Sequence, residues 1–186
     1  MNFNRHSELE GLHAFLGASK HSWVNYDEEK LEDSYLKALA KQRGTRLHDY
    51  ACESIRLGIK LPKNNKTLNM YVNDAIGFKM TPEQPLFYSR NCFGTADTIS
   101  FRTKKLRIHD LKTGVTPASF VQLEIYAALF CLEYDVDPNE IEIELRIYQL
   151  DEIHVEEPEK EQILYIMRKI IDFDRLIERL REENLQ

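Results

Sequence analysis

Two carboxylates and a lysine are close together in the middle of the chain. A predicted strand at 106–112 places Asp110 and Lys112 on one face, because successive side chains of a strand point to opposite sides. A basic turn joins it to a preceding predicted strand at 93–101, and pairing of the two as a hairpin would bring Asp97 near Asp110. Two carboxylates beside a lysine suit a divalent cation and a negatively charged phosphate.

The strand faces that carry these carboxylates are otherwise apolar. Alternation predicts that the following residues of the first strand share one side: Phe93, Thr95, Asp97, Ile99 and Phe101. The plainer interpretation, carboxylates at a turn or edge that aid solubility, fits such faces poorly because an unpaired charge there is costly. For the lysine, the plainer interpretation is a solvent-exposed side chain at a strand end.

Hydrophobic periodicity and turn residues predict the elements that position this group. Before the hairpin, we expect a helix from Asp27 to Gly44, a helix capped by Thr45 that ends near Gly58, a loop at 61–66 and a short helix at 68–76. A strand at 86–88 follows the breaks at Pro82 and Pro85. After the hairpin, we expect a helix capped by Ser119 that extends to Tyr134, a strand at 141–150 and a long amphipathic helix at 158–180. This order predicts an α/β fold with a small mixed sheet flanked by helices.

The length of 186 residues suits a single domain with a substantial core. Within it we expect a helical arm at 1–43, a core at about 44–150 and a C-terminal helix at about 158–182. The sequence lacks an apolar run of the roughly 20 residues that span a bilayer, and its N-terminus does not resemble a secretion signal. We therefore expect a cytoplasmic protein that does not bind membranes.

The composition also restricts partners and redox chemistry. A formal net charge of −6 argues against a protein that coats DNA by charge alone, although a local basic patch is predicted next to the hairpin at Arg102, Lys104, Lys105 and Arg107. The three cysteines are far apart and form no CxxC pair, so they are expected to be small buried side chains rather than disulfide partners or metal ligands.

Several short motifs occur in an order that resembles the RecB-like nucleases of the PD-(D/E)xK superfamily. These motifs are His48 in GTRLHDYACE, Asp97 in GTAD, Asp110-Leu111-Lys112 in HDLKTG, and Gln122 with Tyr126 in QLEIYA. The family includes the RecB and AddB nuclease domains, CRISPR-associated RecB-like exonucleases and small phage nucleases. The resemblance covers residues from about 44 to 127. A single D-x-K is common by chance, whereas this many elements in the right order form a specific pattern.

The resemblance implies a restriction-endonuclease-like core and a set of metal ligands. Asp97 and Asp110 would hold Mg²⁺, or Mn²⁺, with the carbonyl oxygen of Leu111 as a third ligand. His48 would add a nitrogen ligand or support a second ion. Without the resemblance, a core histidine with a hydrogen-bond partner in the helix layer would be the preferred interpretation of His48.

The resemblance gives the other three residues roles next to the metal. Lys112 would contact the attacking water or the scissile phosphate, and its charge would offset the charge that develops on phosphorus. Gln122 and Tyr126, four residues apart on one helix, would orient the lysine and contact the DNA backbone. The spacing alone leaves Tyr126 equally compatible with an ordinary core aromatic.

Taken together, these expectations describe a Mg²⁺-dependent deoxyribonuclease, with exonuclease action preferred over sequence-specific cutting and 5′-phosphate ends as products. Many related exonucleases carry four cysteines for an iron–sulfur cluster, and this sequence has no cysteine after Cys131, so no cluster is expected. The implied setting is phage or bacterial recombination, repair or DNA processing, with a helicase or recombination protein as partner. The alternative is a non-catalytic or partner-activated nucleic-acid-binding subunit of the same fold, and a substrate of RNA also stays open.

Overall fold

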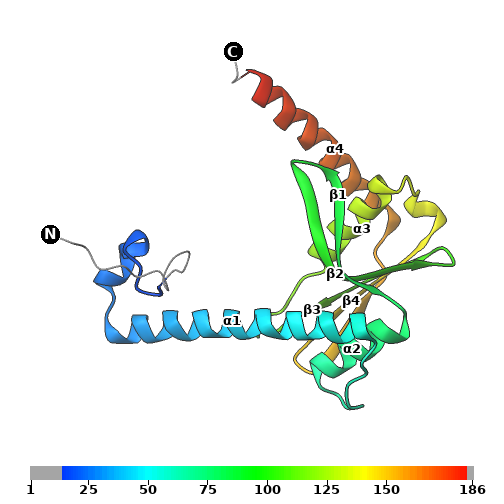
Figure 1. The fold of residues 1–186 in the computed structure, drawn as a ribbon. Coiled ribbons are helices and arrows are strands. Elements are labelled where there is room, and N and C mark those ends of the chain that lie inside the picture. The colour runs from blue at the N-terminus through cyan, green and yellow to red at the C-terminus, as the bar shows by residue number, and fades with distance from the viewer. Residues whose placement is uncertain (1–13, 184–186) are drawn as a thin grey trace, which may run out of the picture. The chain divides into compact units, whose positions relative to one another are not determined.

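The computed structural model describes residues 14–183 (Figure 1). The chain divides into two compact units, Met1–Arg43 and Gly44–Gln186. In the first unit, the short 3-10 helix η2 (Ala18–Asn25) is closed by a hydrogen bond from Trp23 Nε1 to the carbonyl oxygen of Gly17, at 3.0 Å. All the candidate site residues belong to the second unit.

A single long helix, α1 (Glu28–Leu57), replaces the two helices predicted on either side of Gly44. The prediction treated Gly44 as a stop, but this glycine is buried inside the helix. A Cβ atom at Gly44 would lie 2.7 Å from Thr113 Oγ1, so the missing side chain makes room for a neighbouring loop. The helix ends at Leu57, close to the predicted end near Gly58, and the φ of 67° at Gly58 favours glycine.

The second unit contains a five-stranded mixed sheet in the order β1-β2-β3-β4-β5. Its strands are β1 (Thr81–Ser89), β2 (Cys92–Arg102), β3 (Lys105–Leu111), β4 (Glu142–Gln149) and β5 (Glu152–Glu156). Only β3 and β4 are parallel, and α3 (Val121–Glu133) connects them, followed by the short η3 (Pro138–Glu140). The remaining helices are α2 (Thr67–Gly77) and α4 (Lys160–Glu183). The predicted α/β class with a small mixed sheet and flanking helices is confirmed.

Helices cover the sheet on both faces. On one face, Leu106, Ile108 and Leu145 pack with residues of α3 and α4 in the larger core cluster. On the other face, Leu111 and Tyr148 pack with residues of α1 and α2 in a second cluster. The sheet therefore holds β3, which carries Asp110, between two apolar layers.

Three predictions about the sheet and its helices need correction. β1 begins at Thr81 and includes both prolines that were expected to precede it; proline is tolerated there because β1 is an edge strand. β5 was not predicted: it is short and follows a tight turn in which Leu150 and Asp151 both have positive φ. Finally, α3 begins at Val121 rather than directly after Ser119, and Phe120 at its N-cap position makes no side-chain capping bond.

Strict alternation along β2 was also predicted, and it fails in the middle of the strand. Ala96 and Ile99 are both buried in the cluster that contains α3, although they are three residues apart. Phe93, expected on the side of Ile99, is 68% exposed. The alternation of buried and exposed side chains breaks at Asp97, which lies opposite Glu83 in the strand register. Glu83 has a left-handed φ of 50°. An irregular backbone on β1 therefore accompanies the altered side-chain order on β2.

Two further sequence expectations concern cysteines and membranes. Cys52 and Cys131 are buried, Cys92 is half-buried, and all three are free in the described part of the chain. Among residues 14–183, no helix is both long enough and apolar enough to cross a membrane.

Candidate active site

A hydrogen-bonded chain joins four of the predicted site residues. Lys112 Nζ donates to Asp110 Oδ1 at 3.1 Å and to Gln122 Oε1 at 2.9 Å. Gln122 Nε2 in turn donates to Tyr126 Oη at 3.1 Å. The alternation of β3 places Asp110 beside Lys112, the four-residue spacing on α3 places Gln122 beside Tyr126, and the fold brings the two pairs together.

The position of Lys112 is fixed from the backbone as well as from the side chain. Its N–H donates to the carbonyl oxygen of Tyr148 at 2.9 Å, which extends the β3–β4 pairing by one residue past the end of β3. The lysine side chain is 30% exposed, whereas the Asp110 side chain next to it is 3% exposed. The ammonium group thus lies between a buried carboxylate and solvent.

The carboxylate of Asp110 has an oxygen atom that could accept a further hydrogen bond. Its Oδ2 atom lies 3.0 Å from Lys112 Nζ, yet the geometry is too poor for a hydrogen bond, and within residues 14–183 this buried oxygen has no hydrogen-bond partner. The Lys112 ammonium group already pairs with this carboxylate, and a metal cation would be a further partner for Oδ2.

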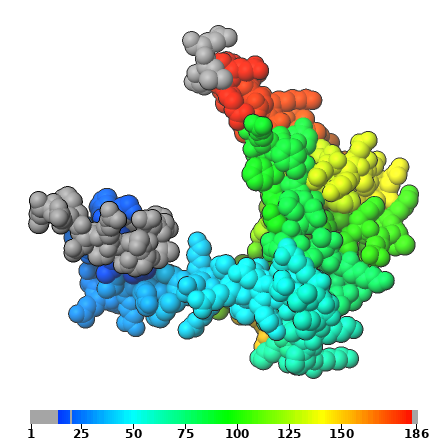
Figure 2. Space-filling model, viewed as in Figure 1, coloured from blue at the N-terminus to red at the C-terminus, as the bar shows by residue number. Residues whose placement is uncertain are grey.

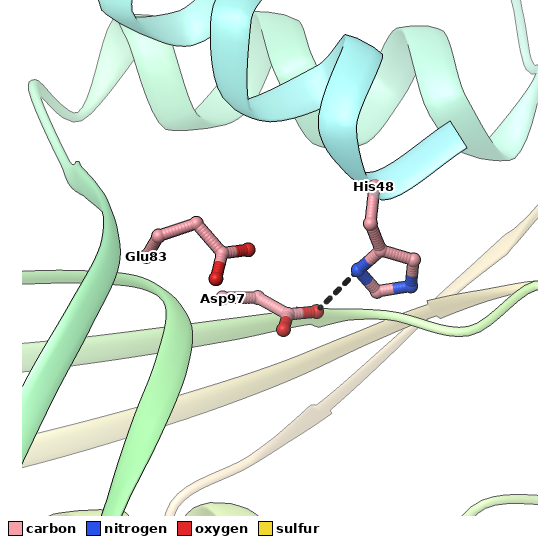
Figure 3. Close-up of side chains that lie close together, drawn as sticks. All are labelled: His48, Glu83 and Asp97. Carbon is pink, nitrogen blue, oxygen red and sulfur yellow. Dashed lines mark ion pairs between the residues drawn. The ribbon is translucent and has the colours of Figure 1, made fainter. Parts of the chain in front are cut away.

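Next to this chain, three side chains from three elements converge (Figure 3). They are His48 from α1, Glu83 from β1 and Asp97 from β2, and one possible ligand atom from each lies within 4.8 Å of the others. His48 Nδ1 is 3.4 Å from Asp97 Oδ2. One imidazole nitrogen and two carboxylates form a donor set that Mg²⁺ or Mn²⁺ would accept, with Mn²⁺ the more tolerant of nitrogen.

Asp97 experiences competing electrostatic influences. Burial raises the pKa of its carboxyl group to about 6, and the negative charges of Asp110 and Glu83 act in the same direction. The Leu111 N–H, which donates to Asp97 Oδ2 at 2.9 Å, and His48 act in the opposite direction. A cation between Asp97 and its neighbouring carboxylates would favour the charged form of Asp97.

The predicted metal set was His48, Asp97, Asp110 and the Leu111 carbonyl oxygen. The structure brings His48 and Asp97 into contact, whereas Asp110 lies outside the group formed by His48, Glu83 and Asp97, although its charge raises the pKa of Asp97. Leu111 contributes its N–H to Asp97, while its side chain is buried.

Glu83 was missed by sequence reasoning. The prediction began the strand at Leu86, which left Glu83 in a loop. The strand register brings it to the site: Pro82 pairs with Thr98, which places Glu83 opposite Asp97.

The predicted basic patch is only partly available to a ligand. Lys105 Nζ lies 2.9 Å from Glu144 Oε2, and Arg107 Nε lies 3.2 Å from Glu144 Oε1. Arg102 and Lys104 are exposed in the β2–β3 turn region. The net positive charge of the patch is therefore smaller than the sequence suggests, and the patch lies around the β2–β3 turn, at the opposite end of the hairpin from Asp97 and Leu111.

An open pocket of about 430 Å³ lies beside Lys112. Four leucines line much of it, from α1, α2, the end of β3 and the β4–β5 turn: Leu47, Leu68, Leu111 and Leu150. Thr67, Thr113 and Asp151 add polar groups. The pocket gives a ligand access to the side of the sheet on which β3 ends.

A scan against protein-family models finds no match for this chain, and neither do searches of curated proteins and of solved structures. The resemblance to RecB-like nucleases therefore stays a prediction that depends on the residues themselves.

Proposed function

We propose that this protein is a metal-dependent nuclease that hydrolyses phosphodiester bonds in DNA. The observation that carries the proposal is the chain Asp110–Lys112–Gln122–Tyr126 beside the cluster of His48, Glu83 and Asp97. A lysine held between a buried acid and an amide, next to a set of possible metal ligands, is suited to a phosphate that has a cation on one side and an ammonium group on the other.

The arrangement of the fold supports the same class. The antiparallel β1–β2–β3 meander is followed by α3 and a return to β4 parallel to β3, with α1 and α2 on the opposite face. This order is compatible with the restriction-endonuclease-like core that the sequence resemblance implies. We infer that core, and membership of the RecB-like nucleases, as part of the proposal.

His48, Glu83, Asp97 and Asp110 are the residues that would hold a divalent cation. When bound, such a cation would polarise a phosphate oxygen and make a water molecule more acidic. The reaction joins the water oxygen to phosphorus and breaks the bond between phosphorus and the 3′-oxygen; the water gives up a proton, and the departing oxygen takes one up. This cleavage leaves 5′-phosphate and 3′-hydroxyl ends.

The protein's own contribution centres on Lys112. Its ammonium group is the charged donor that faces solvent in the site, so it would lie against the negative phosphate and offset charge that grows as the water attacks. Gln122 accepts from the ammonium and donates to Tyr126, which restricts the lysine to one direction. Preorganised charge of this kind needs little rearrangement during the reaction.

The resemblance favours an exonuclease that acts on linear DNA in a recombination, repair or DNA-processing pathway, with a helicase or recombination protein as partner. The alternative is a non-catalytic or partner-activated nucleic-acid-binding subunit. The retained acids and lysine favour catalysis, because a subunit without activity has no need to keep a buried acid paired with a half-exposed lysine.

The test is digestion of end-labelled linear duplex, linear single-stranded and closed circular DNA, with RNA of the same sequence alongside, in Mg²⁺, Mn²⁺ and EDTA. We expect loss of linear DNA only, abolished by EDTA and by Asp110→Asn and Lys112→Ala. Lys63→Ala, at an exposed lysine in the loop before α2, is the matched control and should retain activity. Cutting of circles would make the protein an endonuclease. Metal binding without cleavage of any substrate would support the alternative.

A further inference from the structure

Gly94 lies inside β2, where its own backbone does not require glycine. Within residues 14–183, Gly58 is the glycine with a positive φ, so Gly94 has a backbone conformation that other residues also adopt. Glycine weakens the interior of a strand, because it brings no side chain to pack and loses more conformational entropy than other residues. The reason for glycine at this position therefore has to be the space around it.

That space is filled by the ring of Tyr126 from α3. A Cβ atom at Gly94 would lie 2.9 Å from Tyr126 Cε1, 3.7 Å from Cδ1 and 3.8 Å from Cζ. Carbon atoms in favourable contact are roughly 3.5–4.0 Å apart, so a side chain at this position would collide with the ring. The closest ring atom is bonded to Cζ, which carries the hydroxyl group. The absence of a side chain thus gives room to the hydroxyl end of Tyr126.

The contact is at the border of the larger core cluster. Leu86, which pairs with Gly94 in the β1–β2 register, and Ala96 are buried in this cluster, and Tyr126 packs against it. Gly94 is near the start of β2, in the part of the β1–β2 hairpin that extends towards α4 (Figures 1 and 2). The core on one side and Gly94 on the other therefore define where the ring can lie.

The position of the Tyr126 hydroxyl group matters because of what it bonds. Its oxygen accepts from Gln122 Nε2 at 3.1 Å, and Gln122 Oε1 accepts from Lys112 Nζ at 2.9 Å. An amide group has a donor end and an acceptor end. A hydroxyl oxygen that accepts from the donor end helps to keep the acceptor end turned towards the ammonium group.

We propose that Gly94 is a positioning residue: by admitting the Tyr126 ring, it places the hydroxyl group where Gln122 can donate to it, and so helps to fix the direction of Lys112. The effect on catalysis rests on the proposed nuclease function, whereas the effect on the hydrogen bond does not. β2 then supports both parts of the site, because it also carries Asp97.

Gly94→Ala should act on the ring more than on the strand. The backbone of β2 is held at this point by its pairing with β1, whereas Tyr126 is half-buried and can turn towards solvent. A ring that turns away removes its hydroxyl group from Gln122. We therefore expect the variant to keep its fold, which circular dichroism checks, and to lose the Gln122–Tyr126 hydrogen bond.

The first measurement follows the side-chain amide signals of Gln122 by NMR in the full isotope-labelled chain, without DNA or metal. Gly94→Ala and Tyr126→Phe should shift these signals in the same direction, because both remove the hydroxyl oxygen from the amide. Gly77→Ala is the matched control, since a Cβ atom at Gly77 would meet nothing within 4 Å, and it should leave the signals unchanged. Gln122 signals in Gly94→Ala that match those of the wild type would overturn the proposal.

The second measurement is a double-variant cycle of kcat for cleavage of linear DNA. We expect Gly94→Ala to lower kcat ~5-fold, as Tyr126→Phe does, which is the size expected for one neutral hydrogen bond. Phenylalanine keeps the ring carbon that collides with Cβ and removes only the hydroxyl group. Gly94→Ala should therefore cause no further loss in the Tyr126→Phe background.

An equal loss of kcat in both backgrounds would point to a distorted strand and would overturn the positioning role. So would an unchanged kcat in Gly94→Ala. If the wild-type chain cleaves no DNA, the proposed nuclease function fails, and the Gln122 signals alone then decide whether Gly94 positions the Tyr126 hydroxyl group.

Discussion

Lys112 Nζ donates to Gln122 Oε1 at 2.9 Å across the space between the end of β3 and the first turn of α3. This contact links the lysine on the sheet to the helix that follows it in the chain. It makes the direction of the ammonium group depend on a residue that bears no charge. The proposed reaction should therefore be sensitive to Gln122 even if Gln122 never contacts the cation.

We predict that Gln122→Leu lowers kcat by ~10–100-fold while divalent-cation affinity stays within about twofold, because the lysine loses its orientation but the metal ligands remain. Tyr126→Phe should have a smaller effect, since Gln122 would still hold the lysine. Steady-state DNA cleavage together with calorimetric Mn²⁺ binding would measure both. A larger loss in Tyr126→Phe than in Gln122→Leu would argue against a positioning role for the amide.

Glu83→Gln should weaken Mn²⁺ binding by about tenfold or more, because it removes one of two carboxylates in the His48–Glu83–Asp97 cluster. Glu83 is exposed, so the fold should not change. Glu53→Gln is a suitable control: it makes the same substitution at an exposed position on α1, outside the cluster. Equal Mn²⁺ affinity for Glu83→Gln and wild type would remove Glu83 from the ligand set.

Gly44→Ala should destabilise the protein by ~1 kcal/mol, even though alanine is the better helix former by a similar amount. The new Cβ atom would lie 2.7 Å from Thr113 Oγ1, and a β-branched threonine has few alternative rotamers. In a Thr113→Ala background the clash disappears, so Gly44→Ala should become stabilising. Urea unfolding of the four proteins of this cycle measures the change of sign; the same sign in both backgrounds would contradict the steric explanation.

Glu144 contacts Lys105, Arg107 and Arg146 at the middle of the sheet. Burial raises the pKa of its carboxyl group, but the hydrogen bond from Lys105 and the charges of the three basic residues outweigh burial, so the pKa lies below its ordinary value of 4.5. A carboxyl group whose pKa is lowered by folding stabilises the protein above its unfolded pKa and loses that contribution as pH falls.

Glu144→Gln should therefore lower the free energy of unfolding by ~2 kcal/mol at neutral pH, where the wild-type carboxylate is charged. The difference between variant and wild type should shrink as pH falls below about 4.5, because the wild-type group then becomes protonated too. Denaturant unfolding at a series of pH values gives this difference directly. A difference that does not change with pH would indicate a packing defect instead of a lost charge.

Local rules explain why two of the side-chain contacts in the candidate site were predictable. Alternation on β3 placed Asp110 beside Lys112, and the four-residue spacing on α3 placed Gln122 beside Tyr126. Each relationship depends on neighbours in the same element. The contact between Lys112 and Gln122 also required the two elements to meet, which the family resemblance supplied and periodicity alone did not.

The parts that were not predicted depend on contacts between distant segments. Glu83 reaches Asp97 because an edge strand accommodates proline, and this is a property of the strand's place in the sheet. Gly44 lies within α1, and Thr113 from a distant segment occupies the space that a side chain at position 44 would need. Neither relationship leaves a periodic signal in the sequence.

The prolines of β1 affect how easily a strand from another molecule could pair with this edge of the sheet. Pro82 and Pro85 lack the backbone N–H that an incoming strand would need, and the left-handed Glu83 between them further disturbs that edge. At the other edge, β5 is short and carries Glu152 and Glu156. Both edges thus oppose the addition of foreign strands, which should protect the folded chain from amyloid-like aggregation even when it is concentrated.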